Sequence, residues 1–272
     1  MIIMNKIIKV LLIILLTILV IGLIVVFVLL LNNKIDLNIS QSKLIYDENI
    51  TESFNNIQVS TKSLDIKLVK SNDLNANVKV YDRKFNELSV KVEDNTLKIE
   101  NDRQTSWCFF CFGESKVIIS LPEKEYDLVV NATSGDIESQ VDLNNATIVT
   151  TSGDIDFTKV NELVVTVASG DIEINEANDI TITSTSGDVE IEKINNSLNI
   201  ETTSGDIDID DLTIMKDSNI KATSGDVTIN KTAENIYYNA RATSGDVKIT
   251  NNNRHADYEL KIDTKSGDIK VK

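Results

Sequence analysis

The feature that most constrains the fold is a tripeptide, Ser-Gly-Asp, that recurs at short and nearly regular intervals. It occurs eight times, at steps of 17–22 residues, and starts at Ser134, Ser152, Ser169, Ser186, Ser204, Ser224, Ser244 and Ser266. Recurrence at such a period is typical of repeat architectures, in which one unit cannot bury its apolar face alone and stacks on its neighbours. The chain is therefore expected to fold as a stack of similar units.

The residues after each tripeptide alternate between apolar and polar. The first is always Ile or Val, the next is polar, and the third is apolar in every repeat except at Ser139. This period of two is typical of a half-buried strand. A second short strand precedes each bend, as at residues 180–182, and a polar corner such as residues 175–179 lies between the two strands. Each repeat is predicted to be strand, corner, strand and bend.

Stacked units of this kind predict an all-β fold, a β-solenoid similar to a parallel β-helix. Successive strands lie about 4.8 Å apart, so eight stacked bends span about 34 Å. A β-sandwich with Greek-key connections is the alternative. We assign residues 132–272 to regular repeats and residues 50–131 to degenerate repeats that cap the stack, because terminal repeats are usually atypical. Within this cap, residues 88–92 and 97–100 read as a hairpin.

The glycine of each tripeptide is predicted to have a structural role. Glycine permits a positive φ at a tight bend, and a neighbouring Ser or Asp can bond nearby backbone N–H groups. The turn glycines are Gly135, Gly153, Gly170, Gly187, Gly205, Gly225, Gly245 and Gly267.

The aspartates of the tripeptides form a column in any such stack. Stacked carboxylates repel by about 1 kcal/mol per neighbouring pair in water, and we expect hydrogen bonds from Ser hydroxyls and backbone N–H groups to offset this. The alternative is a weak cation ladder, since calcium takes six to eight oxygen ligands. Its residues are Asp136, Asp154, Asp171, Asp188, Asp206, Asp226, Asp246 and Asp268.

A threonine precedes most of the tripeptides. Such a column is compatible with an array that binds ice or glycan, but Thr is also a common exposed strand residue. Its members are Thr133, Thr151, Thr185, Thr203, Thr223 and Thr243.

An uncharged apolar run covers residues 10–31. Its 22 residues suffice to cross the hydrocarbon core as a helix. A cleavable signal peptide has a shorter apolar region that ends in small residues, and the first alanine of the chain is Ala76. An uncleaved transmembrane helix is therefore expected.

The charges around this run predict its orientation. Lys6 and Lys9 precede it, and Lys34 alone follows closely. The positive-inside bias places residues 1–9 in the cytoplasm and the C-terminal domain outside the cell, joined by a tether at residues 32–49.

An aromatic loop at residues 107–113 interrupts the predicted cap. It is predicted either to cover the open end of the solenoid as an aromatic plug or to make a hydrophobic contact with a membrane or partner. Its cysteines, Cys108 and Cys111, could form a local disulfide outside the cytoplasm, whereas a redox C-x-x-C site needs a βαβ context that the sequence lacks. The candidate partner contacts are Trp107, Phe109, Phe110 and Phe112.

Composition excludes several functions. The chain holds 27 Lys and Arg against 42 Asp and Glu, a formal net charge of −15, which argues against a nucleic-acid partner. One His and two Cys cannot supply a four-ligand zinc site. Because the repeat explains every acid-rich position, we expect neither catalytic residues, nor a cofactor, nor a resident metal.

The run K-V-I-I-S-L-P-E-K-E-Y-D-L-V-V-N-A-T-S-G-D-I at residues 116–137, followed by further T-S-G-D-[IV] repeats, resembles the bacterial "putative adhesin" β-strand-repeat family. That family includes LiaG-like membrane proteins encoded near cell-envelope stress systems. The resemblance covers roughly residues 50–272 and implies a β-solenoid on the outer surface of the membrane, with no established enzymatic activity. The chain departs from the pattern in its aromatic loop and in Ala168 and Lys265, which replace the Thr before Ser.

Two functions follow as expectations. The first is a non-enzymatic, membrane-anchored, extracytoplasmic module of the bacterial cell envelope that binds wall polymer or glycan as an adhesin does. The alternative is an accessory protein of an envelope-stress response, acting through a membrane protein partner.

Overall fold

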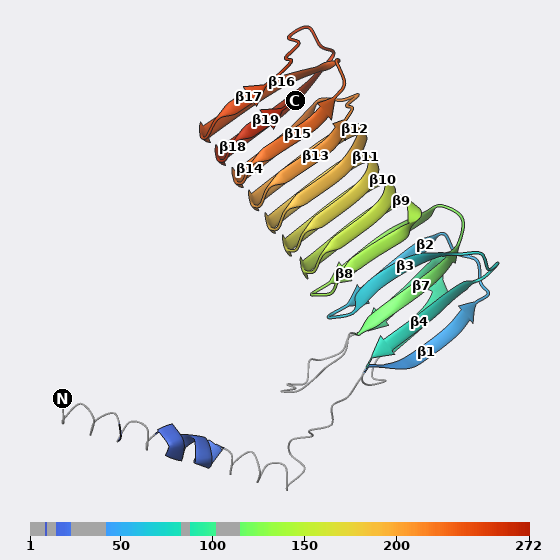
Figure 1. Ribbon diagram of the computed structural model, residues 1–272. Coiled ribbons are helices and arrows are strands. Elements are labelled where there is room, and N and C mark those ends of the chain that lie inside the picture. Colours follow the sequence, from blue (N-terminus) through green and yellow to red (C-terminus); the bar gives the residue numbers. More distant parts are fainter. Residues whose placement is uncertain (1–8, 10–14, 23–41, 83–87, 102–114) are drawn as a thin grey trace. The chain divides into compact units, whose positions relative to one another are not determined.

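The computed structural model describes residues 9, 15–22, 42–82, 88–101 and 115–272 (Figure 1). The chain divides into two compact units, and the larger one, Ser42–Ser106 with Glu114–Lys272, contains every strand of the described residues. We call it the strand unit. Residues 15–22, in the other unit, are helical. Much of the predicted span at residues 10–31 lies outside the described residues, and no described helix is long and apolar enough to cross a membrane.

The described residues of the strand unit form 19 β-strands. The N-terminal eight are β1 (Lys43–Ile50), β2 (Asn56–Thr61), β3 (Asp65–Ser71), β4 (Ala76–Asp82), β5 (Leu88–Glu93), β6 (Thr96–Asn101), β7 (Lys116–Pro122) and β8 (Tyr126–Ala132). The others are β9 (Ile137–Ser152), β10 (Ile155–Ser169), β11 (Ile172–Ser186), β12 (Val189–Ser204), β13 (Ile207–Leu212), β14 (Ser218–Ser224), β15 (Val227–Thr232), β16 (Ile236–Ser244), β17 (Val247–Ile249), β18 (Tyr258–Ser266) and β19 (Ile269–Val271).

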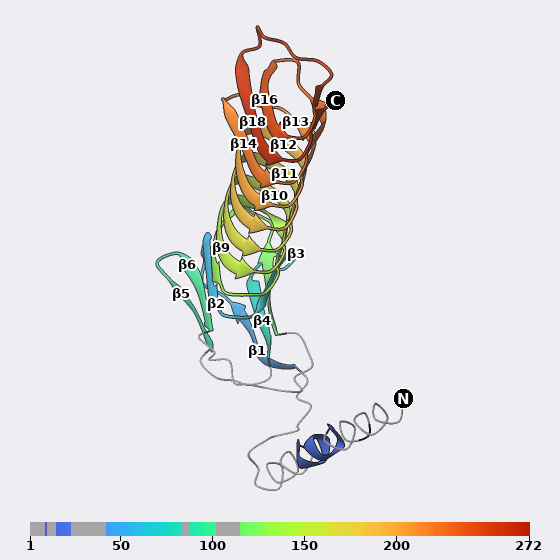
Figure 2. The same cartoon turned by 90° about the vertical axis from the view of Figure 1, so that its left-hand side faces the viewer.

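The regular repeats stack as parallel rungs, as Figures 1 and 2 show. We call one repeat a rung, its stretch after the Ser-Gly-Asp bend the first arm, and its stretch before the next bend the second arm. In β9 to β12 both arms belong to one strand of 15–16 residues. The predicted corner at residues 175–179 is thus not a break but part of β11. The ladder continues through it, and β12 absorbs one extra residue opposite Ala177 and Asp179.

The interior is apolar apart from a few small hydroxyl residues and, in the cap, Asp82 and Asn101. Ile, Val and Leu alternate with outward side chains along both arms. Ser139, the exception in the sequence pattern, is buried and donates its hydroxyl hydrogen to the carbonyl of Val141. Thr150 and Ser184 likewise donate to carbonyls two residues further on. Each of these buried hydroxyls therefore has a local partner, as a buried polar group requires.

The bends of neighbouring rungs are in direct backbone contact. All eight tripeptide glycines have positive φ, between 117° and 142°. At Gly170 φ is 141°, and an added Cβ would lie 2.1 Å from the carbonyl oxygen of Gly153. Only a residue without a side chain fits there, so the glycines set how closely the rungs approach.

The C-terminal end departs from stacking in chain order. A Cβ on Gly267 would meet the carbonyl oxygen of Gly225 at 2.1 Å, and one on Gly245 would meet that of Gly267 at 2.1 Å. In agreement, β18 lies between β14 and β16, and β19 lies between β15 and β17 (Figure 1). The last bend of the sequence is therefore the second to last in the stack.

The cap combines parallel and antiparallel pairing. β2 and β3 continue the solenoid through parallel pairing with β8 and β9, whereas β4 pairs antiparallel with both β1 and β7. β7 also pairs with β3, in parallel. The predicted hairpin is confirmed as β5 and β6, whose turn holds Asp94 and Asn95 at positive φ. The predicted tether at residues 32–49 extends too far, because β1 brings residues 43–49 into the sheet beside β4.

We predict that Gly170→Ala destabilises the strand unit by about 3 kcal/mol or more, since it combines backbone strain with a steric overlap in the bend. Thermal and chemical unfolding of the full chain in detergent measures the change. Lys193→Ala, an exposed corner substitution, is the control and should change stability by less than about 0.5 kcal/mol. Equal stability of both variants would show that the bends are not in close contact.

Candidate functional site

The aspartates of the bends form a continuous chain of hydrogen bonds. The backbone N–H of Asp171 donates to Oδ1 of Asp154 at 2.9 Å, and the N–H of Asp188 donates to Oδ1 of Asp171 at 2.9 Å. The pattern begins at Asp65 of the cap and ends with Asp246, whose N–H donates to Asp268 at 2.8 Å. Hydrogen bonds to the ionised form stabilise a carboxylate, so these bonds offset the repulsion within the column.

This geometry bears directly on cation binding by the Asp column. One oxygen of each hydrogen-bonded carboxylate, such as Oδ1 of Asp188 toward the N–H of Asp206, already accepts from the backbone. Across the described residues, no three His, Cys, Asp or Glu side chains gather in a way that could hold a metal ion. Backbone hydrogen bonding therefore accounts for the aspartates. Unfolding of Asp188 variants with calcium and with chelator tests the cation ladder.

A second acidic column lies on the outer face of the first arms. Its members pair in register across consecutive rungs, about 4.8 Å apart. We call Glu138, Asp156, Glu173, Glu190 and Asp208 the acidic column.

A lysine from the cap forms an ion pair with the first member of the acidic column. Nζ of Lys67 lies 2.6 Å from Oε2 of Glu138 and holds the pKa of that carboxyl below its ordinary value. Partial burial, and then the charge of Glu138, raise the pKa of Asp156. The charge of one carboxylate thus affects the pKa of its neighbour in the column. This acidic face repels anionic polymers.

The second arms carry a face of opposite character. Toward the bends, from β8 to β11, its outward residues are Val, Thr, Ala or Asn, in rows that pair in register. The next row toward the corner carries charge and consists of Asp127, Asn145, Glu162 and Asp179. Two of its apolar side chains are well exposed, Val129 at 40% and Val149 at 46%. We call this set the uncharged face: Val129, Asn131, Thr147, Val149, Thr151, Val164, Thr166, Ala168, Thr181, Thr183 and Thr185.

Charged residues bound the uncharged face at both ends. Glu201 of β12 follows Thr183 in register, and Lys98 of β6 adjoins the other end through β2. Two members of the predicted Thr column, Thr151 and Thr185, lie on this face. The column continues beyond it, through Thr203, in rows that carry charge.

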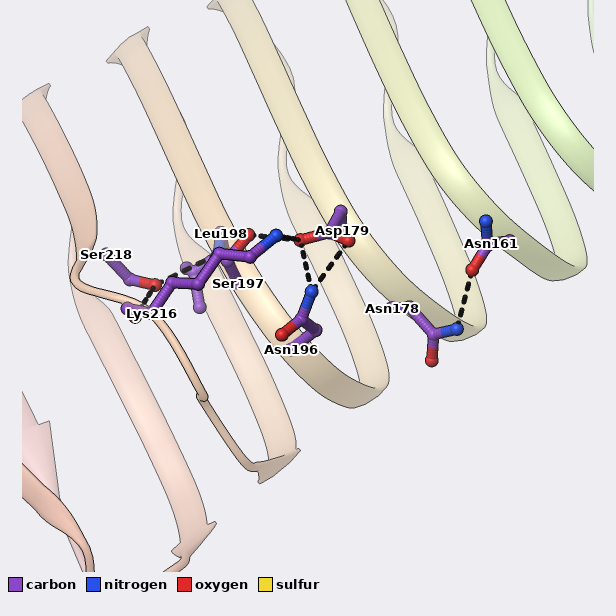
Figure 3. Close-up of polar contacts among 8 residues, drawn as sticks. All are labelled: Asn161, Asn178, Asp179, Asn196, Ser197, Leu198, Lys216 and Ser218. Atoms are coloured by element: carbon purple, nitrogen blue, oxygen red, sulfur yellow. Dashed lines mark hydrogen bonds and ion pairs between the residues drawn. The ribbon is translucent and has the colours of Figure 1, made fainter. Parts of the chain in front are cut away.

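The corner opposite the bends is tied together by polar side chains (Figure 3). Nδ2 of Asn196 donates to both carboxylate oxygens of Asp179 at 2.8 Å, and Ser197 and Lys216 also donate to Asp179. Burial raises the pKa of Asp179, but these hydrogen bonds outweigh it and hold the pKa below its ordinary value. Because Asp179 and its partners together come from three successive corners, this cluster holds the rungs in register.

Other predicted sites remain outside the described residues. The aromatic contacts Trp107, Phe109, Phe110 and Phe112 fall there, as do both cysteines. The acidic column was missed because its positions were read only as polar. The second residue after each repeat Asp reads Glu, Asp, Glu, Glu, Asp, Thr, Lys, Lys along the chain, and this run of five acids was the available signal.

Parallel rungs, glycine bends and two contrasting faces define a β-solenoid repeat protein. The sequence profile of the Toastrack DUF4097 family matches residues 54–272, and the chain belongs to that family. No curated protein matches the chain.

Solved structures resemble this one at low sequence identity. A putative adhesin from Bacteroides fragilis is 16% identical, with a TM-score of 0.56, over 85% of this chain and 99% of that one. A putative lipid binding protein from Parabacteroides distasonis is 17% identical, with a TM-score of 0.47, over 84% of this chain and 96% of that one. At such identities the first likeness supports the solenoid fold and nothing finer.

We predict that Asp188→Ala lowers the free energy of unfolding by about 1–2 kcal/mol, because the N–H of Asp206 loses its acceptor. Asp188→Asn keeps an acceptor oxygen and removes a charge, so it should be nearly neutral. Unfolding of the full chain with calcium and with chelator measures both variants. Calcium-dependent stabilisation of the original chain that both variants lose would establish the cation ladder instead.

Proposed function

We propose that this chain is a non-enzymatic, adhesin-like module of a bacterial cell surface that binds an uncharged polysaccharide through the uncharged face. The observation that carries the proposal is that face itself, ten exposed residues and the half-buried Val164, none of them charged, on a chain of net charge −15. The shared fold with a structure described as a putative adhesin supports the same class.

The chemistry of the face suits a neutral glycan. Thr hydroxyls offer donors and acceptors to sugar hydroxyls, and the methyl groups of Thr and Val offer apolar contact to sugar C–H groups. The rows repeat about every 4.8 Å, so an extended polymer can meet the same chemistry several times. An anionic polymer is disfavoured, because the acidic column and the Asp column repel it.

A second copy of the chain is a poorer occupant of this face. Four rows at about 4.8 Å and an arm of five residues at about 3.3 Å each cover only about 320 Å². Stable protein interfaces bury about 800 Å² per partner. The face is therefore small for a dimer but adequate for a polymer bound at many successive sites.

Membrane anchoring and location belong to the same proposal. The uncharged run at residues 10–31 supports a single-pass helix, and the lysines before it support a cytoplasmic N-terminus. The resemblance to LiaG-like membrane proteins points the same way. In this arrangement the helix holds the solenoid at the outer surface of the cell membrane, where envelope polysaccharide is within reach.

We predict that the double variant Val149→Asp/Thr166→Asp binds neutral polysaccharide at least tenfold more weakly than the original chain. Each new carboxylate must lose water on contact, and about 1.4 kcal/mol already corresponds to a factor of ten. The measurement is co-sedimentation of the full chain, in detergent, with isolated cell walls before and after removal of their anionic polymers.

The matched control is Thr158→Asp/Thr228→Asp, which adds the same charge to the outer face of the first arms. It should bind like the original chain, and stripping the walls of anionic polymer should preserve binding. Equal binding by both double variants, or loss of binding on stripping, would contradict the proposal.

A further inference from the structure

The C-terminal segment, residues 258–271, is inserted between two rungs that precede it in the chain. β14 and β16 both pair with β18, and β15 and β17 both pair with β19. No pairing joins β14 to β16 or β15 to β17 within the fully described stretch 115–272. The outermost rung, β16 with β17, is thus held to the solenoid through the inserted segment. We call the space that this segment fills the C-terminal slot.

Backbone groups on both walls of the slot bond the segment at the bend. The N–H of Gly225 donates to the carbonyl of Ser266 at 3.0 Å, and the N–H of Gly267 donates to the carbonyl of Ser244 at 3.0 Å. The Asp column also continues through the inserted segment, because the N–H of Asp268 donates to Oδ1 of Asp226 at 2.8 Å. Without the segment, each wall would present an unpaired strand edge, which is a template for another strand.

The segment also supplies core. Leu260, Ile262, Ile269 and Val271 are at most 2% exposed, and Thr264 is 3% exposed. They continue the same interior columns as the rungs on either side. An empty slot would therefore leave a gap through the core, so the slot selects a strand with this spacing of apolar residues around a Ser-Gly-Asp bend.

The connection to the segment is a loop outside regular strands. Residues 250–257 lead from the outermost rung back into the slot and are mostly exposed. The side-chain amide of Asn252 pairs with both backbone groups of Tyr238, at 3.0 Å and 2.9 Å, and so covers part of the outermost edge. The chain passes from the outermost rung into the segment only through this loop.

We propose that the C-terminal slot also accepts residues 258–271 of a second copy, so that two chains exchange these segments and form a closed dimer. The occupant is another copy because the slot requires the Ser-Gly-Asp bend, the Asp carboxylate and the interior spacing together. Reciprocal exchange closes with two-fold symmetry and leaves no strand edge unpaired in either slot. Such a dimer presents two uncharged faces, which raises avidity for a polymer without new contacts.

Disulfide trapping between interior positions tests the exchange. Ala222 and Thr264 are paired across β14 and β18 and are both buried, so surface docking of two chains cannot bring them together. Adjacent strands place their Cα atoms about 4.8 Å apart, within the range that a disulfide spans. One full-length chain carries Ala222→Cys and the other carries Thr264→Cys, both with Cys108→Ser and Cys111→Ser.

The two chains, with different affinity tags, are co-expressed and purified in detergent, and cross-linked heterodimer is measured on non-reducing gels. We expect at least fivefold more heterodimer than from the control pair, Ala222→Cys with Thr150→Cys, because Thr150 is buried in a distant rung. A chain with both Ala222→Cys and Thr264→Cys verifies that the geometry permits the bond. Internal closure in that chain, with heterodimer only at the control level, would overturn the proposal.

Discussion

The close contact of successive bends is the constraint on which the rest of the strand unit depends. At Gly187, an added Cβ would lie 2.1 Å from the carbonyl oxygen of Gly170, so the bend backbones stack with no side chain between them. The N–H of Asp206 then reaches Oδ1 of Asp188 at 2.8 Å. Each glycine leaves room for the bend of the neighbouring rung, and each aspartate accepts a hydrogen bond from that bend. These two contacts fix the register of both arms of the rungs.

The surface chemistry follows from this register. Because residues at equivalent positions stack directly, a preference at one repeat position becomes a column on the surface. Acids at the second position after the Asp of the first five tripeptides become the acidic column, and Thr and Val on the second arm become the uncharged face. The two faces of one rung therefore differ sharply in charge, and the proposed specificity for a neutral polymer depends on that contrast.

Local features could be predicted from the sequence, whereas pairings between distant residues could not. Period-two alternation indicated the repeat strands, and the two short segments at residues 88–92 and 97–100 indicated the hairpin of β5 and β6, which local residues determine. The pairing of β1 with β4 was missed because it joins segments with no repeat signature. The position of Gly267 was missed because every bend has the same motif, so the sequence does not distinguish one neighbouring rung from another. The transmembrane segment and the aromatic loop stay predictions.

The most direct measurement is hydrogen exchange of single backbone amides in the full chain. If the bends hold the stack together, the amides of Asp171, Asp188 and Asp206 should exchange as slowly as those of the strand interior, because each is bonded to the carboxylate of the preceding rung. Exchange at these amides as fast as in the loop at residues 250–257 would contradict the claim, since the bends would then be open to water.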